Sequence, residues 1–313
     1  MLNSILAIFP KHLREAFMAG GIMPDDLEEI RVRIQKPLMF RKRKGDYYFH
    51  LKECRLDGNI QGAYIITYPD IQAMLTFLSR YSVYAYTEEL RNGFITLEGG
   101  HRVGLAGQVV TEGEKVTAMP YVNFLNIRIA RQQVGCAKDI CSYLKEGGHV
   151  LNTLIVSSAG VGKTTCLRDC IRILSGEENA KEHYRVGVVD ERSEIAACYM
   201  GIPQNNLGIC TDVLDRCPKS QGMLMLLRSM APDVIAVDEL GSEADFSAVE
   251  QLLNSGCSII GTVHAADMKE LRGKKNLKRW LMSQMFERYV IIRRTQDGGR
   301  YYEIYNGVFE QIR

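Results

Sequence analysis

The chain has 313 residues, of which 46% are hydrophobic and 24% are charged. This composition is typical of a globular protein, and the length favours two domains. A formal net charge of +2 gives no general argument for nucleic-acid binding, and no apolar run approaches the roughly 18 residues that a membrane span requires.

The first 140 residues predict an α+β domain. The N-terminal stretch is expected to form a short amphipathic helix, and it lacks the basic start and small-residue cleavage site of a secretory signal. Ile30, Val32 and Ile34 alternate with charged residues, which indicates a half-buried strand. Apolar residues at helical spacing predict a helix within 70–80.

Glycine turns and further strands complete this domain. Segments 94–110 and 124–131 are expected to form strands that are joined by glycine turns. The stretch 132–149 predicts a short helix that marks a domain boundary. We therefore assign an N-terminal α+β domain to residues 1–140 and a second domain to residues 141–313.

Strands and helices alternate from residue 150 onward. Strands are expected at 150–156, 185–189, 233–238 and 258–263, and helices at 163–174, 220–230 and 244–255. This alternation is typical of a mostly parallel sheet between two layers of helices, so the second domain is predicted to have a three-layer α/β fold. The tail differs, because two strands around a QDGG turn predict an antiparallel hairpin.

The nine cysteines are scattered and include no CxxC pair. A zinc site of the common kind needs two closely spaced pairs, so we expect no cysteine metal site. The spacing instead predicts free, mostly buried thiols in a reducing compartment.

A phosphate-binding loop is expected between the strand at 150–156 and the following helix. Backbone N–H groups of small residues can wrap a phosphate chain there, and the helix N-terminus favours negative charge. Lys163 would reach the β- and γ-phosphates, and Thr164 would hold Mg²⁺. The strict motif has glycine where this chain has Ser157, but the GVGKTT core is intact. We assign nucleotide binding to Ser157, Ser158, Ala159, Gly160, Val161, Gly162, Lys163, Thr164 and Thr165; a glycine-rich turn without a ligand is the alternative.

The apolar run DVIAVDE, at 233–239, ends in two adjacent carboxylates. Asp238 would orient Mg²⁺ through water, and Glu239 would polarise the attacking water. Acidic pairs are common at the active edge of α/β sheets, so the pair alone is weak evidence. A Walker B motif is a buried strand that ends in such carboxylates and follows the phosphate-binding loop in the chain. The segment 233–239 has this position, which favours the functional interpretation.

Two further strand ends carry polar residues. In the segment 190–194, Glu191 would assist the metal or the water and Arg192 would touch phosphate, unless the segment is only a solvated loop with internal ion pairs. His264 closes the strand at 258–263. It would sense the γ-phosphate, or it is an ordinary hydrogen-bonded polar residue; the sequence favours neither.

Phosphoryl transfer gains from an arginine that neutralises transition-state charge. The candidates are Arg102, Arg128, Arg131 and Arg228, each of which alone could be an ordinary surface arginine. The first three lie in the N-terminal domain and would act on a neighbouring subunit's nucleotide. Basic clusters at 41–44 and 272–279 are interpreted as solvated faces rather than as contacts to nucleic acid or anionic lipid.

Together these motifs resemble the stage III sporulation protein AA family over nearly the whole chain. The resemblance rests on the phosphate-binding loop, GVVDERSEIA, TDVLDRCPKSQGM, LRSMAPDVIAVDELG and GTVHA, and on EEIRVRI, RNGFITLEGGHRVGLAG and NIRIAR. That family is similar to type IV secretion and pilus retraction ATPases, which are hexamers with an N-terminal domain and a RecA-like P-loop ATPase domain. In those ATPases an acidic box, a Walker B motif and a histidine at a strand end surround ATP, and arginines of the N-terminal domain reach it. The resemblance implies that Glu191 belongs to the acidic box, that His264 is the strand-end histidine, and that Arg102 and Arg128 are the arginines of the N-terminal domain.

The resemblance also implies a function. The chain would be a Mg²⁺-dependent ATPase, with ATP and Mg²⁺ as cofactors, in the mother-cell cytoplasm or at the inner face of its membrane. It would form a homohexamer and work with membrane-embedded stage III sporulation complex proteins on the channel between mother cell and forespore. Ser157 and Cys210 depart from the family pattern, since Cys210 stands where an arginine is expected, and slow hydrolysis would follow.

Two alternatives stay open at the level of sequence. A nucleic-acid translocase of the same fold would bind nucleic acid with strong salt dependence, and the near-neutral net charge argues against it. A nucleotide-gated scaffold would bind ATP through Lys163 with negligible turnover.

Overall fold

The computed structural model describes residues 2–22, 26–79, 93–113, 115–176, 182–295 and 299–313. The chain divides into two compact units, Met1–Arg131 (unit 1) and Gln132–Arg313 (unit 2). The division falls at Arg131 rather than at the predicted residue 140. Residues after Arg131 belong to unit 2 because the buried Asp169 carboxylate accepts hydrogen bonds from the backbone N–H groups of Gly135 at 3.0 Å and Ala137 at 2.7 Å.

Unit 1 combines helices with an antiparallel sheet. Its helices are α1 (Leu2–Ile8), α2 (Lys11–Ala19) and α3 (Tyr68–Ser79). Its strands are β1 (Leu27–Arg33), β2 (Met39–Lys42), β3 (Gly45–His50), β4 (Arg55–Asp57), β5 (Phe94–Thr96), β6 (Arg102–Glu112) and β7 (Lys115–Arg128). Within the described residues these strands form one sheet in the order β4-β3-β2-β1-β7-β6-β5.

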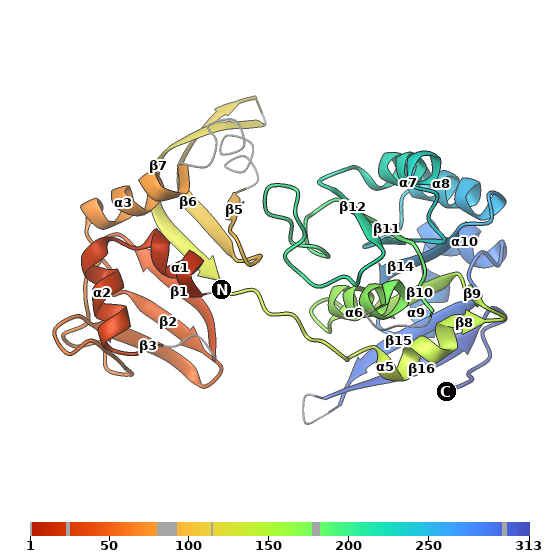
Figure 1. Cartoon of the computed structure of the whole chain (residues 1–313), viewed down its shortest axis with the longest axis horizontal. Coiled ribbons are helices and arrows are strands. Elements are labelled where there is room, and N and C mark those ends of the chain that lie inside the picture. Colours follow the sequence, from red (N-terminus) through yellow and green to blue (C-terminus); the bar gives the residue numbers. More distant parts are fainter. Residues whose placement is uncertain (1, 23–25, 80–92, 114, 177–181, 296–298) are drawn as a thin grey trace. The chain divides into compact units, whose positions relative to one another are not determined.

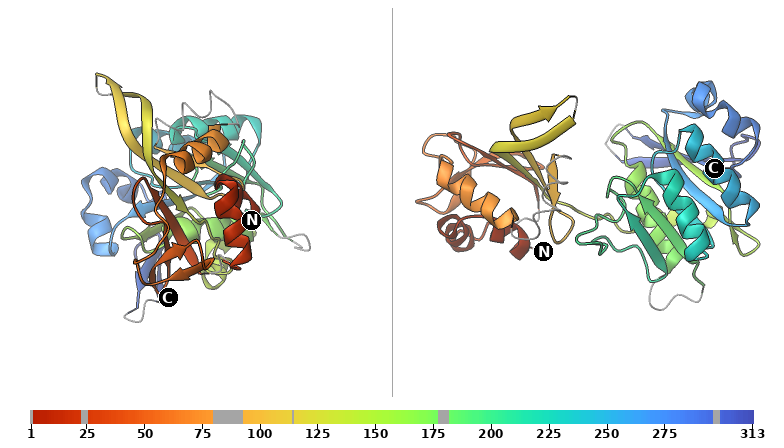
Figure 2. Two further views of the ribbon diagram at one scale, coloured as in Figure 1. Left: turned by 90° about the vertical axis from the view of Figure 1, so that its left-hand side faces the viewer. Right: turned by 90° about the horizontal axis from the view of Figure 1, so that it is seen from above.

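The sequence pattern explains most of unit 1. Ile30 and Val32 of β1 are buried, as the alternation predicted. The single N-terminal helix was wrong, because Pro10 separates α1 from α2; proline lacks the N–H and its ring clashes with the preceding turn. Strand β7 pairs with β1 only from Phe124 to Arg128, and its earlier residues form a two-stranded ribbon with β6 alone (Figure 2).

Unit 2 is an α/β layer structure. Its helices are α5 (Lys138–Cys141), α6 (Lys163–Ser175), α7 (Lys219–Ser229), α8 (Glu243–Asn254), α9 (Met268–Gly273) and α10 (Lys278–Met282), with 3₁₀ turns η1 (Ser142–Leu144) and η2 (Lys275–Leu277). Its strands are β8 (Lys145–Glu146), β9 (His149–Val150), β10 (Thr153–Ser157), β11 (Val186–Asp190), β12 (Thr211–Asp215), β13 (Val234–Val237), β14 (Ser258–His264), β15 (Arg288–Arg294) and β16 (Arg300–Asn306).

The main sheet of unit 2 has the order β12-β11-β13-β14-β10-β15-β16 (Figure 1). Neighbouring strands are parallel except for the antiparallel β15–β16 pair, which confirms the predicted hairpin. Residues 296–298 of its predicted QDGG turn lie outside the described residues. None of the helices in the described ranges is long and apolar enough to span a membrane.

Alternate strand residues of β13 enter two different cores. Ile235 and Val237 pack in the core that contains Phe246 and Leu252 of α8. Val234 and Ala236 face the other way, into the core that contains the buried side of α6. Because both faces of the sheet are covered by helices, the predicted three-layer architecture is confirmed.

Candidate nucleotide site

The loop between β10 and α6 tolerates the serine that replaces the usual first glycine. Ser157 is the last residue of β10 and pairs with His264 of the parallel strand β14. It is buried, its φ is not positive, and its hydroxyl donates to the Ser158 carbonyl oxygen at 2.8 Å. A position with ordinary strand geometry does not require glycine, so Ser157 causes no backbone strain here.

Two later glycines of the loop are required by its geometry. Gly160 and Gly162 have φ values of +72° and +117°, which side chains other than glycine rarely adopt. A Cβ atom on Gly162 would lie 2.7 Å from the guanidinium carbon of Arg300. Arg294 donates to the Gly160 carbonyl oxygen at 2.7 Å. No local motif indicates these two arginines, because they come from the β15–β16 hairpin, far away in the sequence.

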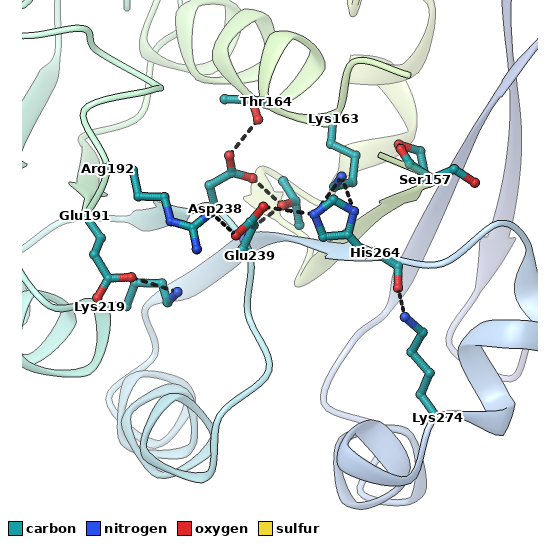
Figure 3. A network of polar contacts seen from close by, with 12 residues as sticks. Ser157, Lys163, Thr164, Glu191, Arg192, Lys219, Asp238, Glu239, His264 and Lys274 are labelled. Carbon is teal, nitrogen blue, oxygen red and sulfur yellow. Dashed lines mark hydrogen bonds and ion pairs between the residues drawn. The ribbon is translucent and has the colours of Figure 1, made fainter. Parts of the chain in front are cut away.

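Lys163 begins α6, and its side chain points at His264 (Figure 3). The Lys163 Nζ atom lies 2.9 Å from His264 Nδ1, and His264 Nε2 lies 2.9 Å from Glu239 Oε1. The ammonium group can only donate, so Nδ1 accepts and these partners assign the imidazole proton to Nε2. Burial lowers the pKa of Lys163, although the carboxylates of Asp238 and Glu239 oppose this effect.

Thr164 and Asp238 form the part of the site that fits a magnesium ion. The Thr164 hydroxyl donates to Asp238 Oδ2 at 2.6 Å, and the Thr262 hydroxyl donates to Asp238 Oδ1. A hydroxyl from the first turn of α6 and a carboxylate at the end of β13 therefore converge. Hard oxygen donors of this kind suit Mg²⁺, which keeps several of its waters.

Glu239 is held at both carboxylate oxygens. Oε1 accepts from His264, and Oε2 lies 2.7 Å from Nη1 of Arg192. The Glu239 backbone is left-handed, with φ of +56°, and its N–H donates to the Thr262 hydroxyl at 2.9 Å. Burial raises the pKa of Glu239, but the hydrogen bond from His264 and the charge of Arg192 outweigh it and hold this pKa below the usual glutamate value.

The second acidic strand end lies beside this pair. Residues after β11 share a small cleft with the end of β13, lined by Asp190, Glu191, Arg192, Glu194, Lys219, Asp238 and Glu239. Glu191 Oε2 pairs with Lys219 Nζ at 2.9 Å, a partner that the sequence did not suggest. Arg192, expected to touch phosphate, contacts Glu239 instead in this structure.

The arginine candidates have different surroundings. Arg102 and Arg128 lie directly opposite each other on β6 and β7 of unit 1, and Arg128 also pairs with Glu29 of β1 in the sheet register. Arg131 donates to the Leu27 carbonyl oxygen at 3.0 Å, which gives it a structural contact. Arg228 lines a pocket with Arg185 and Asp233, next to the amino ends of β11 and β13.

The position of Arg228 argues against its role at the nucleotide site of its own chain. Ligands of parallel sheets bind at the carboxyl ends of strands, and Arg228 lies at the opposite end.

In the basic clusters, Arg41 pairs with Asp46 at 2.8 Å and Lys42 with Asp26 at 3.1 Å, while Arg279 pairs with Glu243. These pairings agree with the interpretation of the clusters as solvated faces.

A glycine-containing loop between a parallel strand and a helix, next to a strand that ends in two carboxylates, defines the P-loop class of nucleotide-binding folds. The pilus retraction motor PilT, solved with bound ADP, superposes with a TM-score of 0.61 over 92% of this chain and 81% of its own, at 13% identity. The Legionella pneumophila ATPase DotB gives 0.56 over 94% and 79%, at 16% identity. These likenesses show that the chain has the fold of the P-loop secretion and pilus ATPases.

The sequence comparisons show the family. The model for sporulation stage III, protein AA matches residues 2–312. Stage III sporulation protein AA of Bacillus subtilis (strain 168) is 38% identical over 309 residues, which cover 97% of this chain and 95% of that protein. The chain therefore belongs to the stage III sporulation protein AA family, as the sequence motifs predicted.

Proposed function

We propose that this protein is an oligomeric, Mg²⁺-dependent ATPase that energises assembly of, or transport through, the channel between mother cell and forespore. The observation that carries the proposal is the Lys163–His264–Glu239 contact chain beside the Thr164–Asp238 pair. These residues come from three separate strand ends, and they are the groups that ATP hydrolysis needs in one place.

Each side chain has a chemical role in this proposal. Lys163 leaves His264 for the β- and γ-phosphates, and Thr164 and Asp238 hold Mg²⁺, which neutralises charge on the phosphate oxygens. Glu239 orients the attacking water and accepts its proton. His264 loses its contact with Lys163 once Lys163 moves, and its ring is then placed to sense the γ-phosphate directly or through water.

The proposal includes a ring of subunits, as a homohexamer at the inner face of the membrane with stage III sporulation membrane proteins as partners. The Arg102–Arg128 pair supports it, because like charges directly opposite on neighbouring strands are unfavourable, and the carboxylate opposite Arg128, that of Glu29, already pairs with Arg31 at 2.6 Å. The γ-phosphate of a neighbouring subunit would offset this repulsion. We propose these two arginines as the groups that act in trans.

A second candidate function is a nucleotide-gated scaffold with little turnover. It is favoured by the contacts at both Glu239 oxygens, because His264 and Arg192 compete with an attacking water for this carboxylate. Substitutions at Lys163 and Glu239 separate the two candidates.

Lys163→Ala tests the nucleotide site itself. We expect it to abolish binding of a fluorescent ADP, since the ammonium group loses its place in the loop, while Glu239→Gln keeps ADP binding and stops phosphate release. Lys269→Ala, an exposed lysine of α9, is the matched control and leaves both unchanged. Unchanged ADP affinity in Lys163→Ala would refute the site; turnover that Glu239→Gln does not alter would favour the scaffold.

A further inference from the structure

The backbone segment that carries Arg192 is held in place by hydrogen bonds. The Asp190 carboxylate accepts backbone N–H bonds from Glu194 at 2.8 Å, from Ile195 at 2.9 Å and from Ala196 at 2.7 Å, which closes the segment into a tight loop. Arg168 of α6 donates to the carbonyl oxygens of Glu194 and Ile195 at 2.6 and 2.7 Å. The backbone around Arg192 is therefore tied to the helix that begins at the phosphate-binding loop.

The Arg192 side chain, by contrast, is largely exposed. It is 64% exposed, and its contact with Glu239 at 2.7 Å joins two partly exposed groups. Exposed ion pairs of this kind contribute little to stability and exchange partners readily. A fixed backbone with an exposed guanidinium allows the side chain to turn between two anions without a change in the fold.

We propose that Arg192 is a cis-acting γ-phosphate contact that leaves Glu239 when ATP binds and stays on Glu239 when ADP binds. This inference rests on the proposed nucleotide site and extends it to discrimination between the two nucleotides. Release by Arg192 opens one carboxylate oxygen of Glu239 to the attacking water, so the general base becomes available only when there is a bond to cleave.

Charge decides which anion the guanidinium prefers. Arg192 and Glu239 line the same cleft as Asp238, which the proposed site places at the Mg²⁺–phosphate group. The γ-phosphate of ATP carries more negative charge than one carboxylate, and it can accept two parallel hydrogen bonds from a guanidinium. ADP has no γ-phosphate and offers no such exchange.

The test compares the affinity for ADP with that for a non-hydrolysable ATP analogue in the full chain. Arg192→Ala is expected to weaken binding of the analogue about fivefold and to leave ADP affinity unchanged, as an exposed charge pair implies. Arg192→Lys keeps the charge and recovers part of the loss. Arg185→Ala is the matched control, because Arg185 is 59% exposed, pairs with Asp233 at 2.6 Å and lies at the other end of the sheet.

A double-mutant cycle tests the exchange between the two anions. Glu239→Gln removes the competing charge, so it should tighten binding of the ATP analogue, and this gain should vanish in the Arg192→Ala background. A gain that persists without Arg192 would mean only that a carboxylate repels phosphate, and it would overturn the proposal. Equal losses for ADP and the analogue in Arg192→Ala would also overturn it. Failure of the wild-type chain to bind ADP would instead refute the proposed nucleotide site.

Discussion

Gly162 is the residue of the site with the least freedom to change. Its φ of +117° strains any other residue, and a Cβ atom would lie 2.7 Å from the Arg300 guanidinium, which would have to move away. We expect Gly162→Ala to weaken ADP binding about tenfold or more, which is about 1.4 kcal/mol, because the loop must shift.

Ser157→Gly is the contrasting substitution in the same loop. Ser157 has ordinary strand geometry, so restoring the motif's glycine should leave ADP affinity unchanged and only lower stability slightly. Titration of both variants with fluorescent ADP measures the difference. Tighter binding by Ser157→Gly would show that the serine impairs the loop after all.

Sequence indicates single candidate site residues when a local motif carries them. Lys163, Thr164 and Glu239 follow from spacing within one strand–turn–helix or one strand end. The partners of Arg192 and the loop contact of Arg300 could not be predicted, because they depend on the order of parallel strands that lie far apart in sequence. The register that pairs Ser157 with His264 is a property of the folded sheet.

At the scale of elements, residues 135–137 near the start of unit 2 are bound to α6. The Asp169 carboxylate binds the N–H groups of Gly135 and Ala137 and pairs with Arg172 at 2.8 Å, fully buried. Asp169→Asn removes the carboxylate that pairs with the buried guanidinium of Arg172. We expect a loss of about 3 kcal/mol in the free energy of unfolding of unit 2.

The same carboxylate gives unit 2 an acid-sensitive stability. Burial raises the pKa of Asp169, but the hydrogen bonds from Ala137 and Gly135 and the charge of Arg172 outweigh it and lower this pKa. The stabilising free energy that Asp169 contributes is therefore fully present above its pKa in the unfolded chain, which is about 3.9. It is lost as the pH falls through the lower pKa of Asp169 in the folded protein. Urea unfolding of the full chain at several pH values, followed by fluorescence of Trp280 in the core of unit 2, measures it. An Asp169→Asn variant with the wild-type pH dependence would contradict this assignment.

Elements with strong periodicity were predicted better than elements at edges. The helices α6, α7 and α8 lie close to their predicted ranges, because a full apolar face marks each of them. The edge strand β12 was missed, since no residue in it is fully buried and its sequence TDVLD lacks a continuous apolar run. The strand predicted at 150–156 is divided between β9 and β10.

At the scale of the whole molecule, the two arginines of unit 1 lead to a specific expectation about assembly. Arg102→Ala and Arg128→Ala should keep ADP binding and lower phosphate release, because the phosphate-binding loop belongs to unit 2 and we propose that the arginines act on another subunit. Arg55→Ala, an exposed arginine of β4 that pairs with Asp57, is the control and leaves turnover unchanged.

The most direct measurement is phosphate release from mixtures of two impaired variants. Arg128→Ala subunits keep Glu239, and Glu239→Gln subunits keep Arg128, so a mixed ring contains complete sites. We predict that the mixture hydrolyses ATP faster than the sum of its components, and that this excess rises with protein concentration. Release equal to that sum would contradict action in trans. A wild-type chain that releases no more phosphate than Glu239→Gln at any concentration would contradict the ATPase itself.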